Sequence, residues 1–404
     1  MYFELALRNI VRQKVRTAMT LAAIVVSVVG LILSAGFVQD IFFQLGEAVI
    51  HSQSAHLQVA RQGYFDEGSR KPERYLIADP GAVARETAAL PGVVDVMARL
   101  QFAGLLNNGK ADLSIVGEGI EPDKEARLGT YMTLRSGRTL AADDRYRILL
   151  GEGVARSMRL APGDRATLQV VTPAGAMNVL EFDVVGVFAS FSKDYDARTV
   201  KIPLAAAREL LDTTGANVLA VLLADTGDTD SVASAAESLV SGRGLEVRRW
   251  RQLNDFYDKT VQLYERQLGV LRVIVLLMVV LSVSNAVNLT LYERIGELGT
   301  MRAMGNRSRQ LYALLMSESA LLGLAGALIG GAVGIGLAKA ISVAGISMPP
   351  PPNANVGYVA QIRVLPSAVL GAMLIAAAAS VAACALPAWR VTRLSIVDAL
   401  RQND

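Results

Sequence analysis

Long apolar runs, separated by segments of mixed character, dominate the hydrophobic pattern of the chain. A helix needs roughly 20 mostly apolar residues to cross a hydrocarbon core of about 30 Å. Four segments meet this requirement, at residues 17–38, 268–291, 311–341 and 367–389. Arg272 and Lys339 lie near predicted outer ends, where a long side chain reaches the headgroups at modest cost. The pattern therefore predicts four transmembrane helices.

The first apolar run, residues 17–38, has a rival interpretation as a cleaved signal peptide. Basic residues precede it, and the small residues Ser34, Ala35 and Gly36 lie near its end. The apolar region of a signal peptide is only about 7 to 15 residues long, and this run is longer. A retained helix is the better interpretation.

Lys and Arg gather on one side of the four predicted spans. They occur in residues 1–16, in residues 292–310 between the second and third spans, and in residues 390–404. The loop at residues 342–366 has only Arg363 and carries four consecutive prolines. Because loops rich in Lys and Arg stay in the cytoplasm, we expect both termini there, with residues 1–16 as an amphipathic helix and residues 390–404 as a tail. The predicted location is a bacterial inner membrane.

Residues 39–267 differ from the spans, because charges return and Gly and Pro interrupt short alternating runs. Strands are predicted at residues 166–171, 179–188 and 218–223, and helices at residues 80–90, 205–211 and 231–241. Residues 247–266 are predicted to extend the second span outward as a helix. The fold class expected is an α-helical membrane protein with four transmembrane helices and a mixed α+β extracytoplasmic domain between the first two.

Composition agrees with this layout and excludes several functions. The chain is 52% apolar and 19% charged, which does not suit a purely soluble protein. Its 40 Lys and Arg are nearly matched by 37 Asp and Glu, so nucleic acid is not an expected partner. The single cysteine, Cys384, excludes an internal disulfide and a cysteine-based metal cluster.

The sequence carries no recognisable catalytic set. It lacks the G-x-x-x-x-G-K-[ST] loop that cradles nucleotide phosphates and the G-x-S-x-G turn of many hydrolases. The two histidines, His51 and His56, are five residues apart, a spacing that favours packing roles over zinc binding. We therefore expect no catalytic residue, metal or cofactor in this chain, and a membrane-anchored enzyme is the weakest interpretation.

The segment at residues 292–310 has the character of a short amphipathic helix on the membrane surface. Acidic residues at its start and basic residues towards its end complement the helix dipole. Apolar residues recur every third position and would form one stripe: Ile295, Leu298, Met301 and Met304. By periodicity alone, a plain surface helix and a functional one are equally good interpretations.

The same segment resembles a known family. The pattern E-R-x-x-E-x-G-x-x-R-A-x-G at residues 293–305 resembles the signature of FtsX-like ABC transporter permeases, a group that includes the macrolide exporter MacB and the lipoprotein-releasing LolC and LolE. The family commonly has Glu-Ile-Gly where this chain has Gly296-Glu297-Leu298-Gly299. Further similar stretches lie at residues 5–9, 16–17, 386–388 and 399–401, and in the outer domain at residues 149–151, 163–164 and 184–187.

The resemblance implies a MacB-type periplasmic core domain, a separate ATPase subunit that binds ATP and Mg²⁺, and a second permease subunit, identical or different. It also implies that one set of residues lies at or beside the ATPase contact: Glu293, Arg294, Glu297, Arg302 and Gly305. The alternative is that some of them only cap and anchor the helix.

Polar and small residues inside the spans are further candidates. Glu318 is either a functional group or a structural partner for a cytoplasmic-side Arg, and Asn285 and Asn288 are expected to pack against a neighbouring helix. Glycines at a small-xxx-small spacing in the third span predict close helix contact. We expect an amphiphile to enter sideways between the first two spans of paired subunits, against apolar residues at Ile24, Val28, Leu31, Val275 and Val279.

The function expected is ATP-driven mechanical extraction or export of an amphiphile, a lipoprotein or lipid, by a permease subunit without ATPase motifs of its own. A periplasmic carrier or an outer-membrane component would be a further partner. One alternative is a non-transporting FtsX-like subunit that regulates a cell-wall hydrolase, and another is drug or peptide export through an outer-membrane channel. The outer domain is larger than a division-type protein would need, which favours export or extraction.

Overall fold

A computed structural model of the chain describes residues 14–68, 72–350, 355 and 357–393. The chain divides into two compact units. The helical unit takes the described parts of Met1–Phe42, Thr260–Ser347 and Val359–Asp404, and the globular domain consists of Phe43–Lys259 and Met348–Tyr358. Most of the helix predicted at residues 1–16 and of the tail predicted at residues 390–404 lies outside the described residues.

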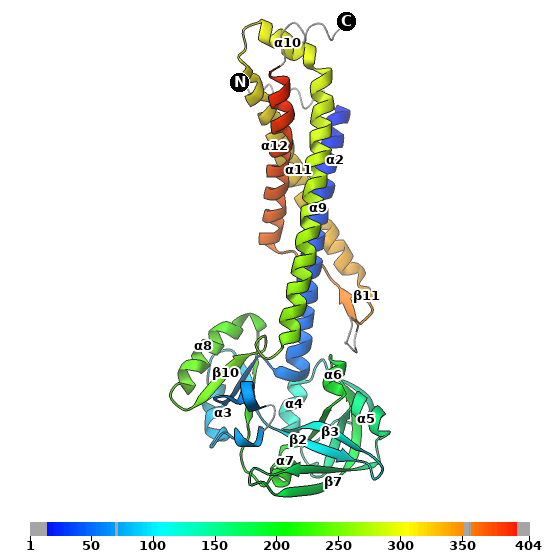
Figure 1. Ribbon diagram of the computed structural model, residues 1–404, viewed down its shortest axis with the longest axis vertical. Coiled ribbons are helices and arrows are strands. Elements are labelled where there is room, and N and C mark those ends of the chain that lie inside the picture. Colours follow the sequence, from blue (N-terminus) through cyan, green and yellow to red (C-terminus); the bar gives the residue numbers. More distant parts are fainter. Residues whose placement is uncertain (1–13, 69–71, 351–354, 356, 394–404) are drawn as a thin grey trace. The chain divides into compact units, whose positions relative to one another are not determined.

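Among the described residues, four helices are long and apolar enough to cross a membrane (Figure 1). They are α2 (Lys14–Val49), α9 (Asp255–Glu293), α11 (Ser308–Ala344) and α12 (Pro366–Val391). A short helix, α10 (Ile295–Ala303), separates α9 from α11. With 36 and 39 residues, α2 and α9 exceed the roughly 20 residues that a bilayer requires, so both continue well past the predicted spans.

Glycines on α11 bring the helices of the helical unit into close contact. A Cβ atom on Gly326 would lie 2.7 Å from Ile24 of α2, and one on Gly330 would lie 2.8 Å from Val28. On another side of α11, a Cβ atom on Gly323 would lie 3.0 Å from Ser380 of α12. The close contact that the glycine spacing predicts is therefore present, because only a residue without a side chain leaves room for these neighbours.

The globular domain contains one sheet of ten strands. Their order is β10-β1-β9-β2-β3-β8-β5-β7-β4, with β6 paired to β2 and β7. The strands are β1 (Leu57–Arg61), β2 (Val93–Asn107), β3 (Asp112–Ile120), β4 (Thr133–Gly137), β5 (Arg147–Gly151), β6 (Arg165–Val171), β7 (Met177–Ala189), β8 (Thr199–Pro203), β9 (Val218–Leu223) and β10 (Leu245–Arg249). Strands β11 (Ile346–Met348) and β12 (Tyr358–Ala360) form a separate pair between α11 and α12.

Helices cover the sheet and divide the domain into two cores. The helices are α3 (Pro80–Ala88), α4 (Pro122–Leu128), α5 (Glu152–Met158), α6 (Lys193–Asp196), α7 (Leu204–Leu211) and α8 (Thr229–Val240). One core joins β1, β9 and the first half of β2 to α3 and α8. The other joins the second half of β2 and strands β3, β5, β6, β7 and β8 to α5 and α7. Strand β2 therefore contributes to both cores. A mixed α and β domain between the first two apolar helices confirms the predicted fold class.

One predicted element of the domain is wrong. Residues 247–266 were expected to be helical throughout, but α9 begins at Asp255 and Val247 lies in β10. Val247 is opposite Val59 of β1 and is 8% exposed, so burial against a neighbouring strand decides its conformation. The other strands and helices predicted in the domain coincide with β6, β7, β9, α3, α7 and α8, within a few residues at each end.

Candidate coupling site

The α10 helix follows α9 after a single residue, Arg294. The Arg294 N–H donates to the Leu291 carbonyl at 3.2 Å, and the Arg294 carbonyl accepts the Leu298 N–H at 2.9 Å. Arg294 therefore ends the hydrogen bonding of α9 and begins that of α10. The chain changes direction here without a flexible linker between the two helices.

Apolar packing holds α10 against the rest of the helical unit. Ile295 is 3% exposed, and Leu298 is 4% exposed and belongs to a cluster with Leu311 and Leu315 of α11 and Ala388 of α12. The predicted stripe is shorter than expected at its end, because Met304 follows the last residue of α10 and is 74% exposed.

An ion-pair chain fixes the start of α10. The Arg294 side chain is 6% exposed, and its Nη1 atom lies 3.1 Å from Glu318 Oε2 of α11. Its Nε atom lies 3.2 Å from Glu297 Oε2, one turn along α10. Glu318 is 13% exposed, whereas Glu297 is 55% exposed. Glu318 was expected to be either a functional group or a structural partner of an arginine, and the structure shows it paired with Arg294. The Arg294 side chain therefore points inward and anchors the start of α10.

A glycine turn connects α10 to α11. Gly305 has φ +98°, a conformation that disfavours side chains. The Gly305 N–H donates to the Arg302 carbonyl and the Asn306 N–H to the Met301 carbonyl, the hydrogen-bond pair of a Schellman motif. The Gln310 side chain then accepts the Arg307 N–H at 2.8 Å, at the start of α11. Gly305 thus allows the chain to turn directly from α10 into α11.

The remaining candidate residues lie on or near the outer side of α10. Glu293 and Glu297 are exposed, and Arg302 is half-buried. Arg302 lines a shallow apolar pocket with Ile295, Leu298, Gly299, Leu311, Val391 and Thr392. The structure therefore places exposed acidic residues at the end of α9 and on α10, next to an apolar pocket that α10 shares with α11 and the end of α12.

Three of the residues expected to contact an amphiphile are buried inside the helical unit. Ile24 and Val28 are fully buried against glycines of α11, and Leu31 is 8% exposed in the same cluster. Val275 is half-buried and packs against that cluster, while the side chain of Val279 lies outside the described residues. In this structure Ile24 and Val28 are helix-packing residues, because the α11 glycines leave space for their side chains.

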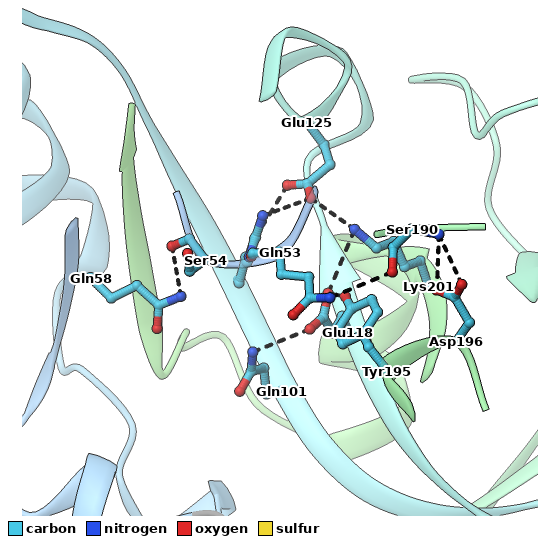
Figure 2. A network of polar contacts seen from close by, with 11 residues as sticks. Gln53, Ser54, Gln58, Gln101, Glu118, Glu125, Ser190, Tyr195, Asp196 and Lys201 are labelled. Atoms are coloured by element: carbon cyan, nitrogen blue, oxygen red, sulfur yellow. Dashed lines mark hydrogen bonds and ion pairs between the residues drawn. The ribbon is translucent and has the colours of Figure 1, made fainter. Parts of the chain in front are cut away.

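The sequence did not reveal a buried charged network in the globular domain. Arg99 of β2 contacts Glu125 of α4 at 2.7 Å. Lys201 of β8 contacts the same carboxylate at 2.9 Å and lies 3.7 Å from Glu118 of β3 (Figure 2). The Tyr195 hydroxyl donates to Glu118 at 2.8 Å. Burial by itself would raise the pKa of Glu125, but the charges of Arg99 and Lys201 outweigh it and lower the pKa to about 2. The sequence signal that could have indicated this network is an isolated charged residue within an otherwise mostly apolar strand, as at Arg99 and Lys201.

The two histidines make structural contacts where α2 leads into the globular domain. His56 Nδ1 accepts the Leu223 N–H at 3.2 Å, and its Nε2 lies 3.1 Å from Thr226 Oγ1. His51 Nε2 lies 3.3 Å from Glu47. Burial, with the neighbouring His51, lowers the pKa of His56 to about 4, so the His56 ring is neutral at ordinary pH.

Comparisons with known proteins agree with this architecture. Residues 17–239 match the MacB-like periplasmic core domain, and residues 269–396 match the FtsX-like permease C-terminal domain. The chain is 28% identical over 262 residues to the pyoverdine export ATP-binding/permease protein PvdT of Pseudomonas putida, which covers 62% of this chain and 37% of that protein. It is 25% identical over 415 residues to the uncharacterized ABC transporter permease protein Rv0987 of Mycobacterium tuberculosis, which covers 99% of this chain and 45% of the relative.

Among solved structures, the periplasmic region of MacB from Actinobacillus actinomycetemcomitans is 14% identical, with a TM-score of 0.37 over 52% of this chain and 95% of that one. The matches to PvdT and Rv0987 cover less than half the length of either relative. The match to the core domain alone covers more than half of the chain, and the permease match adds three of its four apolar helices. The chain therefore belongs to the MacB-like and FtsX-like ABC transporter permeases, and it is a multi-pass membrane protein.

Proposed function

We propose that this chain is the permease subunit of an ABC transporter, and that it couples ATP hydrolysis by a separate ATPase subunit to the extraction or export of an amphiphile. The observation that supports this most directly is the construction of α10. Its inner side is fixed to α11 by Leu298 and Arg294, while Glu297 on α10 and Glu293 at the end of α9 are exposed. A force applied to α10 would therefore reach α11 without being absorbed by a flexible linker.

The proposed arrangement has both termini and α10 in the cytoplasm of a bacterial inner membrane and the globular domain outside. ATP and Mg²⁺ would bind to the ATPase subunit. A lipoprotein or lipid is the proposed cargo, because the apolar helices have few ionisable residues and do not suit a polar channel. A periplasmic carrier or outer-membrane component would receive the cargo.

A coupling defect without a folding defect is expected for Glu297→Ala and Arg302→Ala. Both residues lie on a short helix, and Glu297 is largely exposed, so each change should alter stability by less than about 1 kcal/mol. The amount of membrane-inserted protein should stay unchanged, while the ATPase that co-purifies, or its cargo-stimulated hydrolysis, should fall severalfold. Arg243→Ala, in an exposed ion pair of the globular domain, is the matched control. Normal coupling in both α10 variants would contradict the proposal.

The outer face of α9 supports a second permease subunit as partner. Met278, Leu281 and Leu289 are 63%, 69% and 57% exposed, and Asn285 lies between them on the same helical stripe. Asn288, on the adjacent side of the helix, is half-buried. An asparagine that faces hydrocarbon is costly, and a neighbouring helix satisfies it. We therefore propose that two copies, or this chain and a similar one, pair along this stripe.

Cysteine crosslinking tests this pairing. In a Cys384→Ala background, Leu281→Cys should form a disulfide-linked dimer in native membranes. Adding Asn285→Val should weaken pairing by about 1 kcal/mol, roughly fivefold. Leu370→Cys on α12, which is 59% exposed, controls for random collisions. Equal crosslinking at positions 281 and 370 would rule out a specific interface.

Lateral access of the cargo is proposed along the exposed side of α9, rather than at the buried Ile24 and Val28. Val273 and Leu277 are 56% and 55% exposed there. Photo-crosslinkers at these two positions should capture a lipid or lipoprotein without nucleotide and lose it when ATP traps the complex. Crosslinks confined to the globular domain would instead favour a purely periplasmic cargo.

Export of a small amphiphilic molecule is the second candidate function. PvdT is named as a pyoverdine export protein, and its similarity to this chain covers 62% of the chain. Mass spectrometry of molecules bound to the native complex separates the candidates. A lipoprotein or lipid supports the first, a small exported compound supports the second, and a cell-wall hydrolase without cargo supports a regulatory role.

A further inference from the structure

The loop between α11 and α12 carries a residue that belongs to the globular domain. The described residues of Met348–Tyr358 group with the globular domain rather than with the helices on either side of them. Asn355 makes three hydrogen bonds there. Its backbone N–H donates to the Phe191 carbonyl at 3.2 Å, and its side-chain Nδ2 donates to the Ser190 carbonyl at 3.2 Å and to Asp196 Oδ2 at 2.5 Å.

The site that receives Asn355 consists of acceptors held in a fixed arrangement. The Asp196 carboxylate accepts the Ser190 N–H through both oxygens, at 3.0 Å and 2.9 Å (Figure 2). Ser190 is fully buried and Asp196 is 1% exposed. A Cβ atom on Gly151 would clash with the Asp196 carbonyl oxygen, so β5 supports this turn from behind. The Ser190 and Phe191 carbonyls and the Asp196 carboxylate are therefore held in position to accept hydrogen bonds from Asn355.

Asn355 is a neutral donor that faces a buried carboxylate. Among the described residues, Asp196 has no cation as partner, and burial raises its pKa above the ordinary range for a carboxyl. A lysine or arginine would bind such a group more strongly than an amide does, because it adds the attraction between two opposite charges to the hydrogen bond. An asparagine therefore gives a specific contact that can still be broken.

The same turn also contacts the segment that follows α2. Gln53, in the short π-helix Ile50–Ser54 that continues α2, has its Nε2 atom 3.5 Å from Ser190 Oγ. The Arg99 guanidinium, itself paired with Glu125, donates to the Gln53 carbonyl. Residues continuous with the first membrane helix and with the loop after the third thus meet at Ser190.

We propose that Asn355 is a reversible latch between the α11–α12 loop and the Ser190–Asp196 turn, and that the latch opens and closes during the ATP-driven cycle. The opening step rests on the proposed function. The contact would let movement of α11 and α12 reach the globular domain by a second route, in addition to α2 and α9. It also predicts opposite effects for opposite charges at position 355.

Three variants of the full-length permease test the latch by hydrogen–deuterium exchange. Asn355→Asp places a second carboxylate against Asp196 and should accelerate amide exchange at residues 190–196 by about tenfold, whereas Asn355→Lys should slow it below that of the unmodified protein. Ser347→Asp, at an exposed position of β11 between α11 and α12, adds the same charge as a control and should have no effect. Equal exchange in the Asn355→Asp and Asn355→Lys variants would overturn the contact.

The second measurement is cargo-stimulated ATP hydrolysis by the assembled complex. If the latch must open, Asn355→Lys should lower turnover severalfold while ATPase binding at α10 stays intact. Unchanged turnover in Asn355→Lys, together with the expected exchange pattern, would overturn the opening step and leave the proposed function standing. A complex in which cargo never stimulates hydrolysis, even in the unmodified protein, would count against the proposed function itself.

Discussion

Replacing Arg294 with Met is expected to destabilise the helical unit by about 3 to 5 kcal/mol. The change removes the Arg294 charge from beside Glu318, whose side chain is 13% exposed. Loss of this ion pair in a mostly apolar helix bundle is costly, and the bundle relieves the cost by unfolding locally around α10. Denaturant titration in mixed micelles, followed by the fluorescence of Trp389 in a Trp250→Phe background, measures the loss.

Two further variants identify the ion pair as the cause. The double change Arg294→Met with Glu318→Leu removes both charges and should recover most of the lost stability, because no uncompensated charge remains. Glu297→Gln removes the exposed end of the chain of charges and should cost less than about 1 kcal/mol. A double variant as unstable as Arg294→Met alone would show that the arginine acts through something other than Glu318.

Replacing Glu125 with Gln is expected to cost a similar amount, about 3 to 5 kcal/mol, but in the globular domain. Among the described residues, the change leaves Glu118 as the anion near the buried Arg99 and Lys201. Urea titration of the full-length protein, followed by the buried Trp250 in a Trp389→Phe background, reports on this domain. Glu86→Gln, in the exposed pair with Arg243, is the control and should cost less than about 1 kcal/mol.

The same carboxylate gives the domain a defined acid dependence. The pKa of Glu125 is lowered in the folded protein from 4.5 to about 2, so the unfolded state binds a proton more readily. Its contribution to stability is therefore fully present above about pH 4.5 and is lost as the pH falls towards 2, by about 3 kcal/mol in total. Glu125→Gln should remove this part of the acid dependence. An unchanged slope between pH 4.5 and 2 would contradict the proposed pairing.

Sequence patterns located the four membrane helices because their signal is long and continuous. The strongest strands of the domain were also predicted, since β9 is apolar throughout and β7 follows a clear apolar pattern. Most other strands were not predicted. Strand β4 is exposed along its whole length and β8 carries a charged residue at its centre, so neither shows the alternation typical of a half-buried strand.

Some residues of the candidate site were also indicated by the sequence, whereas their contacts were not. The resemblance pointed to Arg294 and Gly305, but which side chain of α10 faces inward depends on Glu318, 24 residues away along the chain. The Asn355 contact pairs residues separated by 159 positions, and the Arg99 network joins separate strands and α4. No local periodicity encodes such pairs, because they depend on how strands are ordered in the sheet and how a loop returns to it.

The proposed function requires ATP-driven motion to pass from α10 to the globular domain, and the distance between two copies of that domain measures this. A spin label at Met177→Cys, a position 67% exposed in β7, is introduced in a Cys384→Ala background into the paired complex with its ATPase. The distance between the two labels should shift when ATP traps the complex, and the shift should vanish when Glu297 and Arg302 are both replaced by Ala. Identical distances with and without ATP in the unmodified α10 complex would contradict the account.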